Sequence, residues 1–136
     1  MRTLVDTSVW IDWLNARDTA ETDWLQRAIK TGHPIVIPGL VLTEVLRGVA
    51  GEPEARRLAG MLAQFDPPPA LDETDYVEAA RLYRDCRSKG ATIASTVDCL
   101  VAQLAIRHRL ELLTRDSDFA AIARVAPLRL MHRQAH

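Results

Sequence analysis

The sequence contains few of the residues that mark a secreted, a membrane or a zinc-binding protein. Its 136 residues include two cysteines, too few for a disulfide framework, and these match no metal-ligand spacing. Cys86 and Cys99 are therefore expected to be reduced and partly buried. The four histidines share no ligand spacing, which argues against zinc. No apolar run reaches the roughly 18 to 20 residues of a membrane span, and no signal-peptide pattern opens the chain, so a cytoplasmic protein is expected.

The chain also lacks a clear excess of positive or negative charge. The net charge is −1, which does not by itself indicate a nucleic-acid-binding protein. One segment is strongly basic, since a single acid, Asp85, accompanies four cations within it: Arg81, Arg84, Arg87 and Lys89. A solvated helix face and a surface that contacts phosphates both explain such a cluster, and both interpretations stay open.

The remaining composition is that of an ordinary globular domain, with 48% hydrophobic and 26% charged residues. Short apolar segments alternate with segments of helical periodicity, without a repeat or a long linker. This alternation predicts a single α/β domain over residues 1–136, with a small central parallel sheet flanked by helices on both faces. The expected strands cover 3–5, 35–37, 111–114 and 127–130, with an extended piece near Leu71. The expected helices cover 9–15, 22–30, 40–47, 54–64, 73–89 with Thr74 as its cap, 96–109 and 119–125.

The first twelve residues carry the first functional indication. An apolar strand runs directly into Asp6, Thr7 and Ser8, and a helical pattern follows. Strand-to-helix junctions lie at the carboxyl edge of a parallel sheet, where open α/β folds place their binding sites. A helix cap is nevertheless the simpler explanation for one such junction taken alone.

Similar positions recur along the chain. Acids stand where a strand leads into a helix or near the start of the helix that follows, at Asp6, Glu44, Asp98 and Asp116, with Asp118 two residues beyond the last. Taken singly, each has a structural explanation in a cap or in the helix dipole. For Glu44, an ion pair with Arg47 or Arg56 is a further explanation.

Considered together, these acids indicate a metal site. Glu44 and Asp98 have apolar neighbours in the sequence, where an unpaired charge is costly. Carboxylates that share one crevice repel each other and hold protons at neutral pH. A divalent cation removes that repulsion, and ligation by oxygen alone selects a hard ion such as Mg²⁺ or Mn²⁺. Such ions activate water for attack at phosphorus.

The segments around these acids resemble the four acidic motifs of PIN-domain ribonucleases. They cover residues 4–10, 43–48, 98–102 and 114–119, in the same order as in the family. One such motif is weak evidence, whereas four in order over 136 residues are specific. The length of the chain and the spread of the motifs are similar to the VapC toxins of VapBC toxin–antitoxin pairs.

The resemblance implies an endoribonuclease that depends on Mg²⁺ or Mn²⁺ and cleaves tRNA or ribosomal RNA. The residues that match the acidic quartet, which binds the ion and activates water, are Asp6, Glu44, Asp98 and Asp116, with Asp118 in a secondary position. Hydroxyl positions that orient these acids are matched by Thr7, Ser8 and Thr114. The basic cluster from Arg81 to Lys89 is then a candidate for contact with RNA phosphates. A VapB-like antitoxin partner and a homodimer are also implied.

Three alternatives remain open on the sequence. A phosphatase of the haloacid dehalogenase type needs a second acid two residues after the first, where Ser8 stands. A response-regulator receiver needs an acidic pair near the end of the first strand and a lysine on a late strand, which Lys30 and Lys89, the only lysines, do not provide. A non-catalytic acidic interaction domain would leave carboxylates in apolar surroundings unexplained.

Overall fold

The computed structural model describes residues 1–131, which form one four-stranded parallel sheet and seven helices. The strands are β1 (Thr3–Val5), β2 (Ile35–Val36), β3 (Glu111–Leu113) and β4 (Arg129–Leu130). The helices are α1 (Thr7–Leu14), α2 (Ala20–Thr31), α3 (Gly39–Leu46), α4 (Glu52–Leu62), α5 (Glu73–Ser88), α6 (Thr96–Arg107) and α7 (Asp118–Ala123). The predicted α/β class with a parallel sheet is confirmed.

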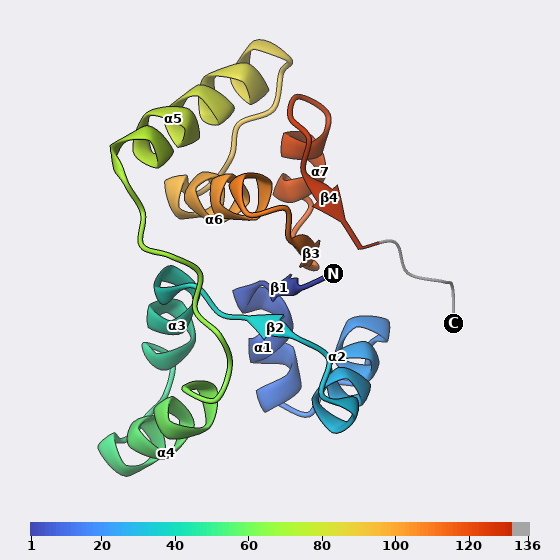
Figure 1. The fold of residues 1–136 in the computed structure, drawn as a ribbon, viewed down its shortest axis with the longest axis vertical. Helices are drawn as coiled ribbons and strands as arrows, with labels where there is room; N and C mark the ends of the chain where they lie inside the picture. Colours follow the sequence, from blue (N-terminus) through green and yellow to red (C-terminus); the bar gives the residue numbers. More distant parts are fainter. Residues whose placement is uncertain (132–136) are drawn as a thin grey trace.

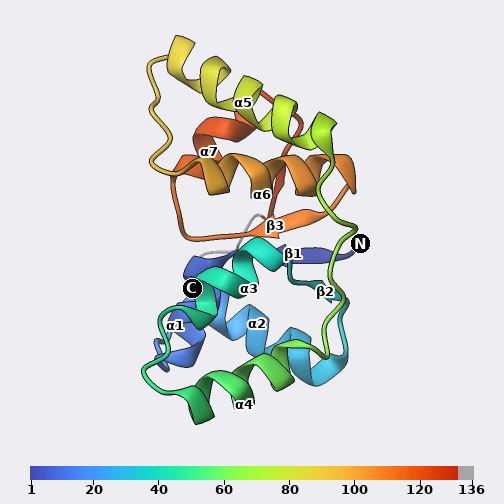
Figure 2. The same ribbon diagram turned by 90° about the vertical axis from the view of Figure 1, so that its left-hand side faces the viewer.

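The helices cover the sheet on both sides. Figures 1 and 2 show α5, α6 and α7 on one side of the strands and α1 to α4 on the other. Because both faces are covered, each central strand is apolar after its first residue, and Leu4, Val5, Leu112 and Leu113 are fully buried. The sheet therefore forms the middle layer of an α/β/α arrangement.

The strand order β2-β1-β3-β4 places β1 and β3 next to each other in the middle. In their parallel register Val5 lies opposite Leu113, so both strands end at the same level. The backbone N–H of Asp6 extends this pairing by donating to the carbonyl of Leu113 over 2.9 Å. The sheet thereby brings the residues after β1 and after β3, which are far apart in the sequence, side by side.

Several helix starts differ from the prediction, because side-chain caps define them. Helix α1 begins at Thr7 since the Asp6 carboxylate accepts from the N–H of Ser8. Helix α2 begins at Ala20, where a break was expected, since Thr19 and Thr22 form a reciprocal capping box. The predicted cap of α5 at Thr74 is wrong: Asp72 is the cap and pairs with Asp75.

The strand expected near Leu71 is also wrong. Residues 67–72 adopt no strand, and instead Asp66 forms an isolated parallel bridge with Val36 at the edge of β2. The prolines at 67–69 have no backbone N–H to continue the pairing. Helix α6 ends at Arg107 rather than at 109, since Arg109 takes a left-handed conformation with φ of 54°.

The two cysteines are unpaired, as predicted, and both are buried. Burial is the main reason that the pKa of the Cys99 thiol rises to about 11, so this thiol stays protonated. Over the described residues, the helices are too short or too polar to cross a bilayer.

Candidate active site

Asp6 is the best-buried acid of the candidate site, with 4% of its surface exposed. Its Oδ2 accepts hydrogen bonds from the hydroxyls of Ser8 (2.8 Å) and Thr114 (2.9 Å). Burial raises the pKa of Asp6 above its ordinary value, and these hydrogen bonds oppose that rise. Two of the three predicted orienting hydroxyls therefore hold one carboxylate, which joins the end of β1 to the end of β3.

Glu44 reaches the same region from α3. Its Oε1 accepts a hydrogen bond from the Thr7 hydroxyl over 2.9 Å, and its side chain is half-buried. Of the arginines considered as its partner, Arg56 pairs with Glu52 on its own helix. Thr7 thereby links the first turn of α1 to α3, as Ser8 and Thr114 link the first turn of α1 to β3.

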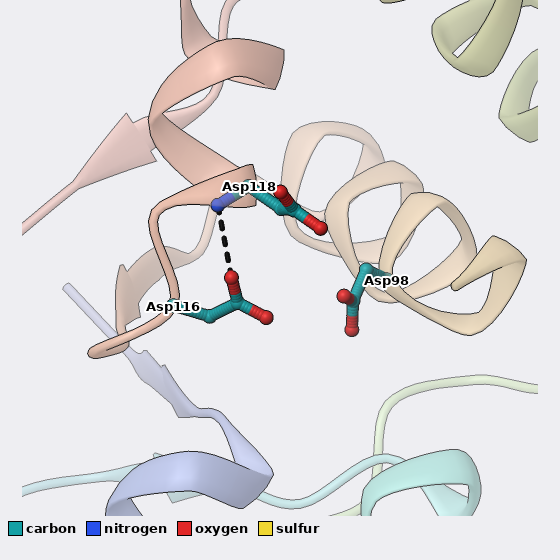
Figure 3. Close-up of side chains that lie close together, drawn as sticks. All are labelled: Asp98, Asp116 and Asp118. Carbon is teal, nitrogen blue, oxygen red and sulfur yellow. Dashed lines mark hydrogen bonds between the residues drawn. The ribbon is translucent and has the colours of Figure 1, made fainter. Parts of the chain in front are cut away.

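Asp98, Asp116 and Asp118 form the tightest group of acids. One carboxylate oxygen from each lies within 4.8 Å of the other two. Figure 3 shows the three side chains gathered between α6 and the start of α7. Asp98 comes from the first turn of α6, while the other two flank the start of α7. The Asp118 N–H donates to Asp116 Oδ1 over 2.9 Å, and this bond shapes the loop that carries both. Asp118, secondary in the sequence interpretation, is thus as much a part of this group as Asp116.

Asp98 is the electrostatic centre of the site. Burial, followed by the charges of the four other acids, raises its pKa from 3.8 to about 7. The acids that exert this effect are, in order of size, Asp6, Asp116, Glu44 and Asp118. The four other predicted carboxylates therefore all lie close enough to Asp98 to affect its ionisation.

This donor set fits a hard divalent cation. The five acids contribute only carboxylate oxygens, which Mg²⁺ and Mn²⁺ prefer. Burial, together with the repulsion of the other four acids, raises the pKa of Asp98 to about 7, and a cation between the acids would remove that repulsion. No basic side chain makes an ion pair shorter than 4.0 Å with any of the five, within residues 1–131.

The basic cluster lies apart from the acids, at the exposed carboxyl end of α5. Arg81 pairs with Glu78 over 3.0 Å, and the Arg87 guanidinium lies 5.7 Å from the centre of the Tyr83 ring. Arg84 and Lys89 are exposed. A short loop leads from this end of α5 to the amino end of α6, which carries Asp98 (Figure 2).

An apolar groove lies between α1, α3 and α4. Its volume is about 560 Å³. Ile11 and Leu14 of α1 face Val45 of α3 and Leu58 and Met61 of α4 across it. Two of the helices that line the groove, α1 and α3, also carry Thr7 and Glu44, but the groove is lined by the later residues of both helices and by none of the five acids.

Sequence reasoning overlooked the surroundings of Arg115, which stands between Thr114 and Asp116. This arginine makes ion pairs with Asp12 of α1 and Glu21 of α2, both of them buried. Its position inside an acidic motif could have drawn attention to Arg115, but the sequence does not show which helices the side chain contacts.

Comparison with known proteins places this geometry in a family. The family model described as "PIN domain" matches residues 3–125. The VapC ribonuclease Mb1587 of Mycobacterium bovis and the ribonuclease VapC11 of Mycobacterium tuberculosis are each 31% identical over 126 residues, which cover 92% of this chain and 94% of theirs.

Solved structures show the same fold. The structure of VapBC2 from Rickettsia felis, bound to a DNA fragment from its promoter, contains a chain that matches with a TM-score of 0.75 and 20% identity, over 98% of this chain and 100% of that one. The structure of VapBC-1 from nontypeable Haemophilus influenzae contains a match with a TM-score of 0.74 and 15% identity, over 96% and 97%.

Proposed function

Since this chain belongs to the PIN domain family, among its VapC members, we propose that it is the toxin of a VapBC-type pair and acts as a metal-dependent endoribonuclease. The observation that carries the proposal is the group formed by Asp98, Asp116 and Asp118, whose carboxylate oxygens lie within 4.8 Å of one another. The names of the relatives support RNA as the substrate class. The resemblance to VapC toxins further leads us to expect tRNA or ribosomal RNA as the target.

Each acid has a role in this proposal. Asp98, Asp116 and Asp118 would hold a Mg²⁺ or Mn²⁺ ion, with Asp6 and Glu44 completing the negative field around it. When bound, the ion supplies positive charge that favours ionisation of an attacking water and offsets charge on the phosphate oxygens. Thr7, Ser8 and Thr114 fix the rotamers of Glu44 and Asp6, so that these carboxylates are oriented before substrate arrives.

Asp98 also has a proton to lose. With a pKa of about 7, its carboxyl group carries a proton in a large fraction of metal-free molecules at neutral pH. Ion binding requires the ionised form, so uptake of the ion releases this proton and becomes tighter as the pH rises.

Incubation with two substrates tests the proposed activity. Labelled RNA should be cut internally with Mg²⁺ or Mn²⁺ and stay intact with EDTA, since the acids alone cannot offset charge on a phosphodiester. A phosphate monoester should not be hydrolysed under the same conditions. Cleavage that is indifferent to EDTA, or hydrolysis of the monoester alone, would contradict the proposal, and the second result would favour a phosphatase.

The basic cluster is proposed to contact RNA phosphates. If Arg81, Arg84, Arg87 and Lys89 are changed together to glutamine, the slope of log K against log salt should fall by about 0.7 for each phosphate that is no longer neutralised. The matched control changes Arg56 and Arg57 of α4, which pair with Glu52 and Glu54. If the salt slope stays the same in both variants, the cluster does not contact RNA phosphates and is a solvated helix face.

We also propose a VapB-like antitoxin as the partner. The neighbouring VapBC structures support this proposal, and so does the groove between α1, α3 and α4, whose Ile11 and Leu14 are exposed and suit an apolar peptide segment. The proposal requires that such a segment continue from Val45, which lines the groove, to Glu44, the preceding residue of α3. The VapC relationship further leads us to propose a homodimer, for which exposed Tyr76 and Val77 of α5 offer an apolar surface.

A further inference from the structure

An ion-pair cluster in which two buried acids contact a partly exposed arginine lies beside the loop between β3 and α7. Asp12 of α1 is 8% exposed and Glu21 of α2 is 4% exposed, although neither belongs to the acidic site. Both face the guanidinium of Arg115: its Nη1 hydrogen-bonds Asp12, and its Nε lies 3.6 Å from Glu21 Oε1. Burial of two carboxylates costs free energy of desolvation. Apolar residues at these two positions would pack α1 against α2 without that cost.

The cluster fixes the residue that precedes Asp116. A guanidinium is a rigid planar fork, so contacts with two acids on two helices set its position and direction. The Arg115 backbone is held as well, because its N–H donates to the Ser8 hydroxyl over 3.1 Å, and that hydroxyl donates to Asp6. Arg115 is therefore attached through its side chain to α1 and α2 and through its backbone to the Asp6 network.

We infer that Asp12 and Glu21 are positioning residues, which act through Arg115 to hold the Asp116 carboxylate within reach of Asp98 and Asp118. The inference rests on the proposed function, since it assigns the cluster to the same metal site. The three acids repel one another, so a loop without this anchor would relax away from Asp98. Binding of the ion would then have to order the loop again, which lowers affinity.

Arg17 supplies a matched control. Its Nε lies 3.7 Å from Asp12 Oδ1, so it is also a cationic partner of Asp12. Its side chain is 65% exposed, whereas that of Arg115 is 42% exposed, and Arg17 belongs to the segment between α1 and α2 rather than to the β3–α7 loop. Removal of Arg17 therefore changes the charge around Asp12 without releasing the loop.

The test compares Asp12→Asn, Arg115→Gln, the double variant and Arg17→Gln with the unaltered protein. Mn²⁺ affinity is measured without RNA, from the electron paramagnetic resonance signal of the free ion, and kcat and KM are measured at saturating Mn²⁺. Each single variant should weaken Mn²⁺ binding about tenfold, as loss of a residue that orients a ligand does, and leave the KM for RNA unchanged. The double variant should bind Mn²⁺ with the same affinity as the single variant that binds it less tightly, because both substitutions break the same contact. Arg17→Gln should bind Mn²⁺ as tightly as the unaltered protein does.

Unchanged Mn²⁺ affinity in Asp12→Asn would overturn the inference. So would a raised KM with normal Mn²⁺ affinity in Arg115→Gln, because it would mean that Arg115 contacts RNA directly. If a variant does not fold, Arg115→Lys keeps the charge beside the two acids but loses the fork, and it should still weaken Mn²⁺ binding by about threefold or more. Failure of the unaltered protein to bind Mn²⁺ and to cut RNA is a separate result, which would contradict the proposed function itself.

Discussion

Replacement of Asp98 by asparagine is expected to lower RNA cleavage by roughly a hundred- to a thousandfold. The substitution keeps the shape of the side chain but removes the charge of an acid at the centre of the site, so a Mg²⁺ or Mn²⁺ ion loses a ligand. The matched control is Glu111→Gln, since Glu111 lies at the opposite end of β3 from the site. A variant that still cuts RNA at the normal rate would show that Asp98 is not a principal ligand.

The same substitution should stabilise the protein when no metal is bound. The pKa of Asp98 is about 7 in the folded protein against an ordinary value of 3.8. Between these two values the unfolded chain gives up the proton more readily than the folded one, so stability falls as the pH rises through this window. Above about pH 7 the full penalty applies, and below about pH 4 it vanishes. Asparagine has no proton to lose and escapes the penalty.

Thermal melts in EDTA measure this effect. At about pH 8 Asp98→Asn should be more stable than the unaltered protein by about 2 to 4 kcal/mol, since a difference of about 3 pKa units corresponds to at most about 4 kcal/mol. The melting temperature should rise by roughly 5 to 10 °C, and at about pH 5 the gap should be smaller. Added Mn²⁺ should raise the melting temperature of the unaltered protein more than that of the variant. A variant that melts lower at both pH values would mean that Asp98 has a structural role.

Inhibition by the antitoxin should compete with the metal ion. A cluster of carboxylates that suits a divalent cation also suits a guanidinium, which can bond to carboxylates through two parallel hydrogen bonds. We propose that an antitoxin segment occupies the groove between α1, α3 and α4 and continues past Val45, which lines the groove, to place an arginine in the cluster beside Glu44. High Mn²⁺ should therefore weaken inhibition.

Two substitutions distinguish this mechanism from one in which the antitoxin only blocks access to the active site. Substitution of the antitoxin arginine by alanine should weaken inhibition by about ten- to a hundredfold, because it removes a charge-assisted hydrogen bond. Substitution of Leu14 by serine in the toxin should weaken binding of the segment but leave the competition with Mn²⁺ in place. If Mn²⁺ leaves inhibition unchanged and no arginine of the antitoxin matters, the antitoxin acts elsewhere.

Much of the site's location could be predicted, because all strands of a parallel sheet have their carboxyl ends at the same edge. Asp6 and Asp116 each follow an apolar strand, and parallel strands that start together end together. The motif order then restricts which helices can bring Glu44 and Asp98 to that edge. The catalytic and metal-binding roles of these residues stay predictions, whereas the fold that places them is confirmed.

The ion-pair cluster could not be predicted, because it depends on how α1 packs against α2. Asp12 and Glu21 are spaced like ordinary surface acids on two amphipathic helices. Only the packed structure shows that both point at Arg115, a residue far from them in the sequence. The prediction of Thr74 as the cap of α5 was wrong for a local reason. Thr74 and Asp72 are both good capping residues, and the reciprocal hydrogen bonds between Asp72 and Asp75 favour Asp72.

The proposed metal centre is tested most directly by an anomalous difference map from crystals grown with Mn²⁺. A peak is expected at the carboxyl edge of β1 and β3, with carboxylate oxygens of Asp98, Asp116 and Asp118 among its neighbours, at least two of them at about 2.1 Å. The same map from Asp98→Asn crystals should show a weaker peak or none. A Mn²⁺ peak that lies away from these acids, or a peak of equal height in the variant, would contradict the claim that this cluster is the metal centre.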